Sequence, residues 1–263
     1  MKKEAVDFSV KFSQSVKVNF LRKKVIRKGM LCGKMKECIS SMLGEVADLE
    51  SRKVERCLGV DGDSPKGKKD EDIDRQVSYL ISYPSFVDYF RFLSDGNRDR
   101  KRLVAGVFMV YGWMPRIPRF NCGEEMNEEE FIEVYDFLSR LQKCGLSEAL
   151  DLMDEDGVRC LEKVKRMTNN SVVGMSKLLH FVNPVVFPMY DSHIQAIVGE
   201  VESVGDYLGY MKGFNGFCGK FIDEISEFAK SREIFNLRER FSYDKNFILS
   251  HVRLVEMSLF LVG

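Results

Sequence analysis

Residues 169–199 read "NNSVVGMSKLLHFVNPVVFPMYDSHIQAIVG". The apolar residues in the first half of this stretch recur with helical spacing, and the Asn183–Pro184 pair then interrupts the helix. An apolar extended run follows, and residues that favour helix N-termini precede a second short helical pattern, which Gly199 ends. The sequence therefore predicts two helices, over 170–181 and 192–198, and a short connector that brings their ends close together.

This layout places a lysine and an aspartate near one another. Lys177 lies on the first predicted helix, and Asp191 lies at the start of the second. A lysine buried in such a corner loses solvation, which lowers its pKa and makes its amine a nucleophile. A carboxylate at a helix N-terminus is stabilised by free backbone N–H groups and by the helix dipole. The pair suits a reaction through a positively charged sugar, in which the amine attacks the anomeric carbon and the acid stabilises the charge.

Both residues also have a structural interpretation. Asp191 is a common type of N-cap residue, and Ser192 with Gln195 would cap the same helix if the aspartate had another task. Lys177 would be an ordinary surface lysine if its side of the helix faced solvent. The sequence leaves these alternatives open.

The segment resembles the catalytic part of the helix-hairpin-helix DNA glycosylases. In that family a lysine in the hairpin is followed, after a helix and an apolar stretch, by a V-D-T-H-V run that opens the next helix. In the run "MYDSHI" the family's aspartate, threonine and histidine correspond to Asp191, Ser192 and His193, and Lys177 stands at the lysine. The resemblance covers about thirty residues. It implies cleavage of the N-glycosidic bond of a modified or damaged base that is flipped out of the DNA.

Three features depart from the family pattern. The family has glycines two and four residues before the lysine, where this chain has Met175 and Val173, with Gly174 between them. In the family those glycines let backbone N–H groups approach a DNA phosphate. The interval from Lys177 to Asp191, fourteen positions, is several residues shorter than is usual. No cysteine cluster follows, so the iron–sulfur module of some relatives is absent and no cofactor is expected.

A second group of candidate residues lies in "YGWMPRIPRF", residues 111–120. It contains the single tryptophan, Trp113, together with Arg116 and Arg119. Aromatic and guanidinium groups together suit base stacking and phosphate contact. The alternative is a tryptophan buried against a helix end, with the arginines at the surface. The expected DNA-binding or base-pocket group is completed by three residues of the first segment, which otherwise have structural roles: His180, Ser192 and His193.

Composition restricts the class of protein and its surroundings. A chain of 263 residues that is 44% hydrophobic and 30% charged suits a globular protein with a sizeable core. The 40 basic and 40 acidic residues cancel, so a surface for double-stranded DNA would be a local patch. The seven irregularly spaced cysteines fit free thiols in a reducing compartment, not a disulfide framework or a metal site. No apolar run reaches membrane-spanning length, so we expect a cytoplasmic protein, or one at the nucleoid or in the nucleus if it acts on DNA.

The pattern along the rest of the chain is mainly helical. Alternating apolar residues before position 20 favour a small β-hairpin, and no strand signal follows. We therefore expect a mainly α fold, an irregular orthogonal array of helices in two lobes with a cleft between them. Two parts are predicted. Residues 1–75 form a basic N-terminal region that ends in a mobile loop over 59–74, and residues 76–263 form a helical domain that contains 169–199.

The predicted helices follow apolar residues that recur every three or four positions. Outside the first segment, one predicted helix ends near Leu58. The others cover 85–93, 100–114, 127–144, 146–154, 156–167, 221–228 and 245–262. Glu256 interrupts the apolar face of the last one, and we expect it to pair with Arg253 or with a lysine across the core.

Two functions follow from these patterns. The first is a DNA glycosylase that uses Lys177 as nucleophile and Asp191 as electrostatic stabiliser. The alternative is a non-enzymatic nucleic-acid-binding or protein-interaction module on the same helical scaffold. The enzyme interpretation depends on whether the two side chains meet in the folded chain.

Overall fold

The computed structural model describes residues 31–57, 68–113, 126–241, 243–244, 247 and 249–260. Within these residues the structure consists of twelve α-helices and one 3-10 helix, with no strand. This confirms the expected mainly α fold. The predicted hairpin before residue 20 lies outside the described residues, and the predicted cleft between two lobes stays a prediction.

The elements follow one another without any regular repeat. In chain order they are α3 (Leu31–Cys57), α4 (Lys68–Tyr89), the 3-10 helix η1 (Phe90–Asp95), α5 (Arg100–Gly112), α6 (Glu128–Lys143), α7 (Leu146–Asp151), α8 (Glu155–Met167), α9 (Val172–Val182), α10 (Ser192–Val198), α11 (Val204–Lys220), α12 (Ile222–Ala229), α13 (Arg232–Arg240) and α14 (His251–Phe260). The two helices predicted from the first segment correspond to α9 and α10, and their bounds agree to within two residues.

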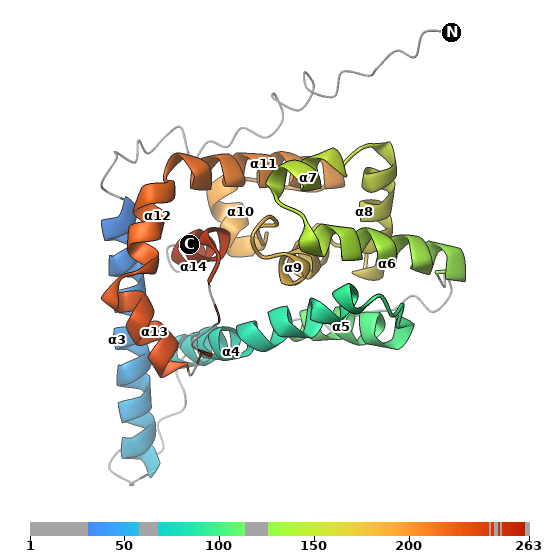
Figure 1. Ribbon diagram of the computed structural model, residues 1–263. Coiled ribbons are helices and arrows are strands. Elements are labelled where there is room, and N and C mark those ends of the chain that lie inside the picture. Colours follow the sequence, from blue (N-terminus) through green and yellow to red (C-terminus); the bar gives the residue numbers. More distant parts are fainter. Residues whose placement is uncertain are drawn as a thin grey trace, which may run out of the picture.

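Helix α9 lies at the centre of the array (Figure 1). It packs against α4, α5, α6, α8 and α11. Apart from Val173, every residue of α9 is buried, including the polar Ser176, Lys177 and His180. A helix that is apolar on nearly all sides must be covered by neighbours all round, and this explains why its few polar groups sit deep in the molecule.

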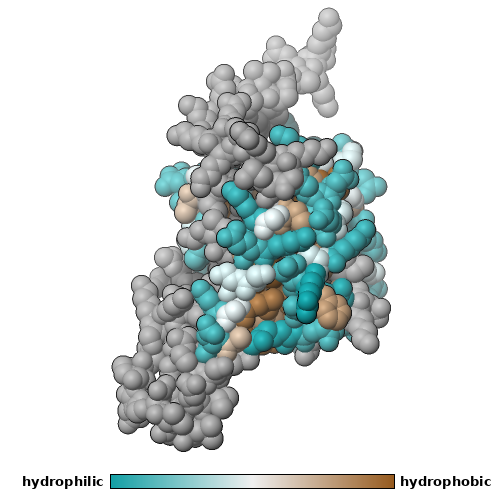
Figure 2. Space-filling view, turned by 90° about the vertical axis from the view of Figure 1, so that its left-hand side faces the viewer, coloured by the Kyte–Doolittle hydropathy of each residue, from teal (hydrophilic) through white to brown (hydrophobic). Residues whose placement is uncertain are grey.

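The outer helices bury one face each. In α6 the predicted apolar stripe, Phe131, Val134, Leu138 and Leu141, is buried in the core. The predicted cap is also present, because the side chain of Asn127 accepts a hydrogen bond from the Glu130 N–H at 2.9 Å. Figure 2 views the molecule from the side of α3, α12 and α13, where the described residues are mainly hydrophilic and apolar residues show between them, most clearly in the lower half.

The first long helix belongs to the same core as the rest of the chain. Helix α3 packs against α12, α13 and α14, and Cys32, Met35, Ile39 and Met42 join the main cluster of buried apolar residues. The boundary predicted near residue 75 lies inside α4. Residues 68–74 were expected in a mobile loop, and this is wrong because they form the first turns of that helix.

Helix α4 continues through Pro84, whereas the sequence pattern predicts a helix that starts only after it. Proline has no N–H, so the carbonyl four residues earlier, that of Leu80, loses its helical partner. The hydroxyl of Tyr243 donates a hydrogen bond to this carbonyl at 2.6 Å. A side chain from a distant part of the chain therefore compensates the proline. The C-terminal helix was predicted from 245, but α14 begins at His251.

Candidate functional site

A tight turn, residues 168–171, joins α8 to α9. Asn169 and Asn170 have φ angles of 56° and 54°, a left-handed conformation that asparagine tolerates better than most residues. The side chain of Ser171 caps α9 by accepting a hydrogen bond from the Gly174 N–H at 3.1 Å. The chain thus forms a helix–turn–helix pair whose second helix carries Lys177.

Gly174 permits the close approach of α9 to this turn. A Cβ atom at Gly174 would lie 2.8 Å from the Cβ of the buried Thr168. We expect Gly174→Ala to lower the free energy of unfolding by about 1–3 kcal/mol, because buried neighbours must shift. Gly216→Ala in α11 is the matched control, since a Cβ there meets nothing within 4 Å. That change should be neutral or stabilising by up to ~1 kcal/mol. Denaturant unfolding compares the two variants, and equal effects would contradict the prediction.

Lys177 is buried, and its interpretation as a surface lysine is wrong. The residue is 7% exposed. Its Nζ donates a hydrogen bond to the backbone carbonyl of Trp113, at the C-terminal end of α5, over 2.9 Å. Among the described residues, Lys177 Nζ makes this one hydrogen bond. An ammonium group can donate three. Desolvation lowers the pKa of Lys177 from its ordinary value.

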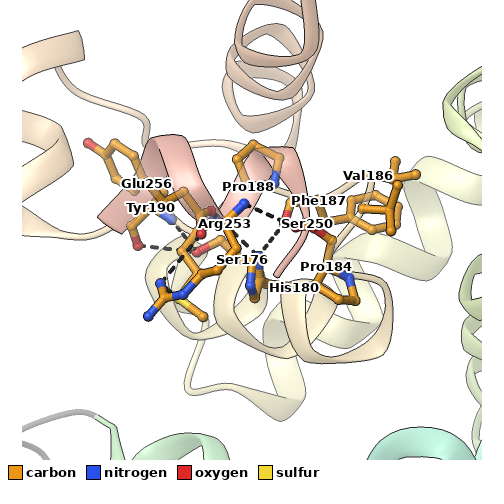
Figure 3. Close-up of polar contacts among 12 residues, drawn as sticks. Ser176, His180, Pro184, Val186, Phe187, Pro188, Tyr190, Ser250, Arg253 and Glu256 are labelled. Carbon is orange, nitrogen blue, oxygen red and sulfur yellow. Dashed lines mark hydrogen bonds and ion pairs between the residues drawn. The ribbon is translucent and has the colours of Figure 1, made fainter. Parts of the chain in front are cut away.

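Ser176 ties the lysine helix to the residue before Asp191. The Tyr190 N–H donates a hydrogen bond to Ser176 Oγ at 3.0 Å (Figure 3). Because Ser176 precedes Lys177 and Tyr190 precedes Asp191, this bond brings the two candidate residues into the same region. The negative charge of Asp191 acts on Lys177 and raises its pKa, which partly opposes the effect of burial.

Asp191 is the N-cap of α10. Its Oδ1 accepts hydrogen bonds from the backbone N–H groups of His193 and Ile194, both at 3.0 Å. The alternative cap by Ser192 is therefore wrong. The aspartate is partly exposed, unlike the lysine. The cap orients its carboxylate towards the start of the helix and restricts its rotation.

The connector between α9 and α10 crosses the core without regular secondary structure. Buried backbone polar groups need partners, and here side chains supply them. The donors to its carbonyls are Ser250 to Pro184 (2.6 Å), Asn215 to Val186 (2.8 Å), His180 to Phe187 (2.7 Å), Tyr207 to Pro188 (2.9 Å) and Tyr210 to Met189 (2.8 Å). Figure 3 shows the connector between side chains of α9 and side chains of α14. These bonds fix the path of the chain into Asp191.

His180 belongs to this network as a neutral group. Its Nδ1 lies 2.7 Å from the carbonyl of Phe187, and its Nε2 lies 2.8 Å from the hydroxyl of Tyr83. A carbonyl only accepts, so Nδ1 carries the proton and Nε2 accepts from Tyr83. Burial and the charge of Arg253 lower the pKa of His180 well below 6.5. This geometry fits the structural interpretation of His180.

Two charged residues of α14 complete the buried cluster. Arg253 is 8% exposed and Glu256 is 2% exposed, and Arg253 Nη1 lies 3.5 Å from Glu256 Oε2. The predicted pairing of these residues is therefore confirmed. Glu256 Oε1 also accepts a hydrogen bond from the Met189 N–H in the connector. Desolvation raises the pKa of Glu256 to about 8, although Arg253 opposes this rise.

Trp113 contributes its backbone to the site, while its ring is part of the core. The residue is 5% exposed, its Nε1 donates to Ser82 Oγ at 2.9 Å, and its ring stacks on Tyr79 with 5.0 Å between centroids. This burial favours the second interpretation of Trp113, a tryptophan packed against a helix end. Its carbonyl, not its ring, contacts Lys177.

The remaining predicted residues fall outside the buried cluster. Ser192 and His193 are exposed in the first turn of α10, close in sequence to Asp191. Arg116 and Arg119 lie outside the described residues. The structure therefore brings together Lys177 and the region of Asp191, and it leaves the expected DNA-contacting group without a common surface among the described residues.

Sequence reasoning predicted that Arg253 could pair with Glu256 but missed that this pair lies beside the connector, and it missed the role of Ser176. A signal for Arg253 exists, because it and Glu256 stand three positions apart in the otherwise apolar run "VRLVEM". Charged residues at such positions are buried only when they are paired, so they mark a buried polar cluster. Ser176 offers no comparable signal, because a serine in an apolar helix is compatible with many structural roles.

Other classes of site find no support in the described part of the chain. No group of three or more histidine, cysteine, aspartate or glutamate side chains there could hold a metal ion. None of the described helices combines the length and apolar character needed to cross a bilayer. Comparisons with protein-family models, with curated proteins and with solved structures give no match.

Proposed function

We propose that this protein is a DNA glycosylase that cleaves the N-glycosidic bond of a modified or damaged base. The observation that carries the proposal is the buried lysine on α9, tied by Ser176 to the residue before Asp191. The resemblance of residues 169–199 to helix-hairpin-helix glycosylases points to DNA rather than to another N-glycoside. The target base would enter the site by rotating out of the duplex.

In the proposed reaction the neutral amine of Lys177 attacks C1′ of the target nucleotide. The bond from nitrogen to C1′ forms as the bond from C1′ to the base breaks, and the electron pair leaves with the base, which takes up a proton. The lysine nitrogen releases a proton to solvent. Opening of the sugar ring then turns the adduct into an imine between Lys177 and C1′. Burial supports this role because it lowers the pKa of the Lys177 amine.

Asp191 has a separate role in the proposal. Positive charge develops on the sugar as the bond to the base breaks, and a carboxylate held nearby stabilises that charge. The two hydrogen bonds from the α10 backbone hold the Asp191 carboxylate in place before the reaction, so little reorganisation is needed. Its partial exposure keeps it within reach of a bound nucleotide.

Borohydride trapping tests the proposal directly. The full chain is incubated with duplex oligonucleotides that carry an abasic site or an oxidised, deaminated or alkylated base, and sodium borohydride then reduces any imine to a stable adduct. We expect a covalent protein–DNA species with the wild-type chain and a loss of at least about a hundredfold with Lys177→Met. Lys165→Met is the control, because Lys165 lies on α8 and pairs with Glu162 at 2.9 Å.

Other outcomes decide against the enzyme. Neither adduct nor base release from any duplex in the panel, with a folded wild-type chain, would overturn the proposal. Salt-dependent DNA binding without any adduct would favour the non-enzymatic binding module instead. Equal loss of adduct in both lysine variants would show that trapping does not report on Lys177.

A further inference from the structure

Helix α10, which begins directly after Asp191, is too short to hold its own position. It has seven residues, and a helix of that length is not stable in water without tertiary contacts. Ile194 and Val198 are buried in the core, and the helix packs against α14. Hydrophobic contacts are not directional, so hydrogen bonds near the two ends of α10 are needed to fix its orientation.

One residue, Tyr190, makes hydrogen bonds at both ends of α10. At the N-terminal end its backbone N–H donates to Ser176 Oγ of α9 at 3.0 Å, and its carbonyl oxygen lies 3.2 Å from the same hydroxyl. At the C-terminal end its side-chain hydroxyl donates to the carbonyl of Gly199 and accepts from the N–H of Val201, both at 3.0 Å. Because Gly199 is the C-cap of α10, Tyr190 connects α9 with both ends of this helix.

The side chain of Tyr190 is itself held in place. The residue is buried, and its ring meets the ring of Tyr210 edge-on, with 5.8 Å between centroids. Gly199 has a φ angle of 95°, which residues with a Cβ atom rarely adopt, so the chain turns sharply where the hydroxyl binds it. The hydroxyl thus joins two backbone groups on either side of this turn.

We infer that Tyr190 is a positioning residue, a clamp that holds both ends of α10 and so fixes the Asp191 carboxylate relative to Lys177. Asp191 directly follows Tyr190, and Lys177 directly follows the serine that binds the Tyr190 backbone. The hydroxyl bridge at the far end of α10 then restrains rotation of the helix and of the carboxylate that caps it. The clamp does not depend on any reaction, whereas its effect on catalysis rests on the proposed function.

Hydrogen exchange of backbone amides tests the clamp on the full chain without DNA. Tyr190→Phe removes only the hydroxyl and keeps the ring, so the carbonyl of Gly199 and the N–H of Val201 lose this partner. We expect peptides that cover residues 192–201 to exchange about tenfold faster than in the wild type, because the helix opens locally more often. Exchange in α9 should stay unchanged.

Tyr135→Phe is the matched control for the loss of a hydroxyl. Tyr135 on α6 is also buried, and its hydroxyl donates to the carbonyl of Asn97, before α5, at 2.7 Å. This variant should leave exchange over 192–201 unchanged. The clamp is refuted if Tyr190→Phe leaves that exchange unchanged, or if Tyr135→Phe accelerates it equally.

Single-turnover base release measures the effect of the clamp on the proposed reaction. Tyr190→Phe should slow the chemical step about 10–100-fold and change DNA affinity less than about twofold, because a displaced carboxylate affects the transition state more than binding. In the Asp191→Asn background the same change should slow base release less than about twofold. The charge that the clamp positions is already absent there, so the two effects do not add.

The results distinguish this inference from the proposed function. With an active wild type, unchanged base release in Tyr190→Phe, or equal slowing with and without the Asp191 charge, would disprove the positioning role. If the wild type releases no base but Tyr190→Phe alone accelerates exchange over 192–201, the proposed function fails and the clamp stands.

Discussion

Asp191→Asn should slow base release by about 10²–10³-fold while it leaves the folded state nearly unchanged. Asparagine is as good an N-cap residue as aspartate, so its side-chain oxygen can still accept from the N–H groups of His193 and Ile194. The change removes only the negative charge. If that charge stabilises the developing positive sugar, activity falls and stability does not. Single-turnover base release and denaturant unfolding measure the two quantities on the same preparations.

A matched control comes from another helix of the chain. Asp154 caps α8 in the same way, with its Oδ1 accepting from the Gly157 N–H at 2.9 Å. Asp154→Asn should therefore have the same small effect on unfolding and no effect on base release. If Asp191→Asn, like the control, changes the free energy of unfolding slightly and leaves base release unchanged, Asp191 acts only as an N-cap.

A second large effect concerns pH and Glu256. The pKa of this carboxyl is raised from 4.5 to about 8 in the folded chain. Between these values the folded protein keeps a proton that the unfolded chain releases, so the free energy of unfolding falls as pH rises through this window, by up to about 1.4 kcal/mol per pH unit. The stabilisation is complete below pH 4.5 and lost above pH 8. Across the window the loss amounts to a few kcal/mol.

Glu256→Gln should remove this pH dependence, because an amide does not ionise and can still accept from the Met189 N–H. Urea unfolding of wild type and variant at intervals from pH 5 to pH 9 gives the difference. His180 contributes the opposite slope at low pH, since its pKa is lowered in the folded chain, and this contribution largely cancels between the two proteins. If the free energies of unfolding of the wild type and the variant change with pH in parallel, Glu256 is ionised throughout this range and Arg253 fully compensates its charge.

Local signals predicted most of the elements that form the site. The periodicity, Asn183–Pro184 and Gly199 defined the two helices and the connector, and α9 and α10 follow these limits closely. Such signals depend on residues within one turn of each other, so the sequence contains them directly. The same holds for the cap of α6 at Asn127.

Features that depend on distant contacts were predicted poorly. The helix through Pro84 needs the hydroxyl of Tyr243, which lies 163 positions from its acceptor residue Leu80. The basic and aromatic run around Trp113 suggested a DNA-contacting loop, whereas the tryptophan ring is enclosed by other aromatic residues. In both cases a local pattern had two structural explanations, and only the neighbours in space distinguish them.

By itself, the sequence determined that Lys177 lies on one short helix and Asp191 at the start of the next, with an apolar connector between the two helices. Only the tertiary structure decided that the lysine faces inwards and binds the carbonyl of Trp113, 64 positions earlier. The physical reason is that helix periodicity and capping depend on residues close together in the sequence. The charge state of a buried amine depends on which groups from distant parts of the chain replace its water.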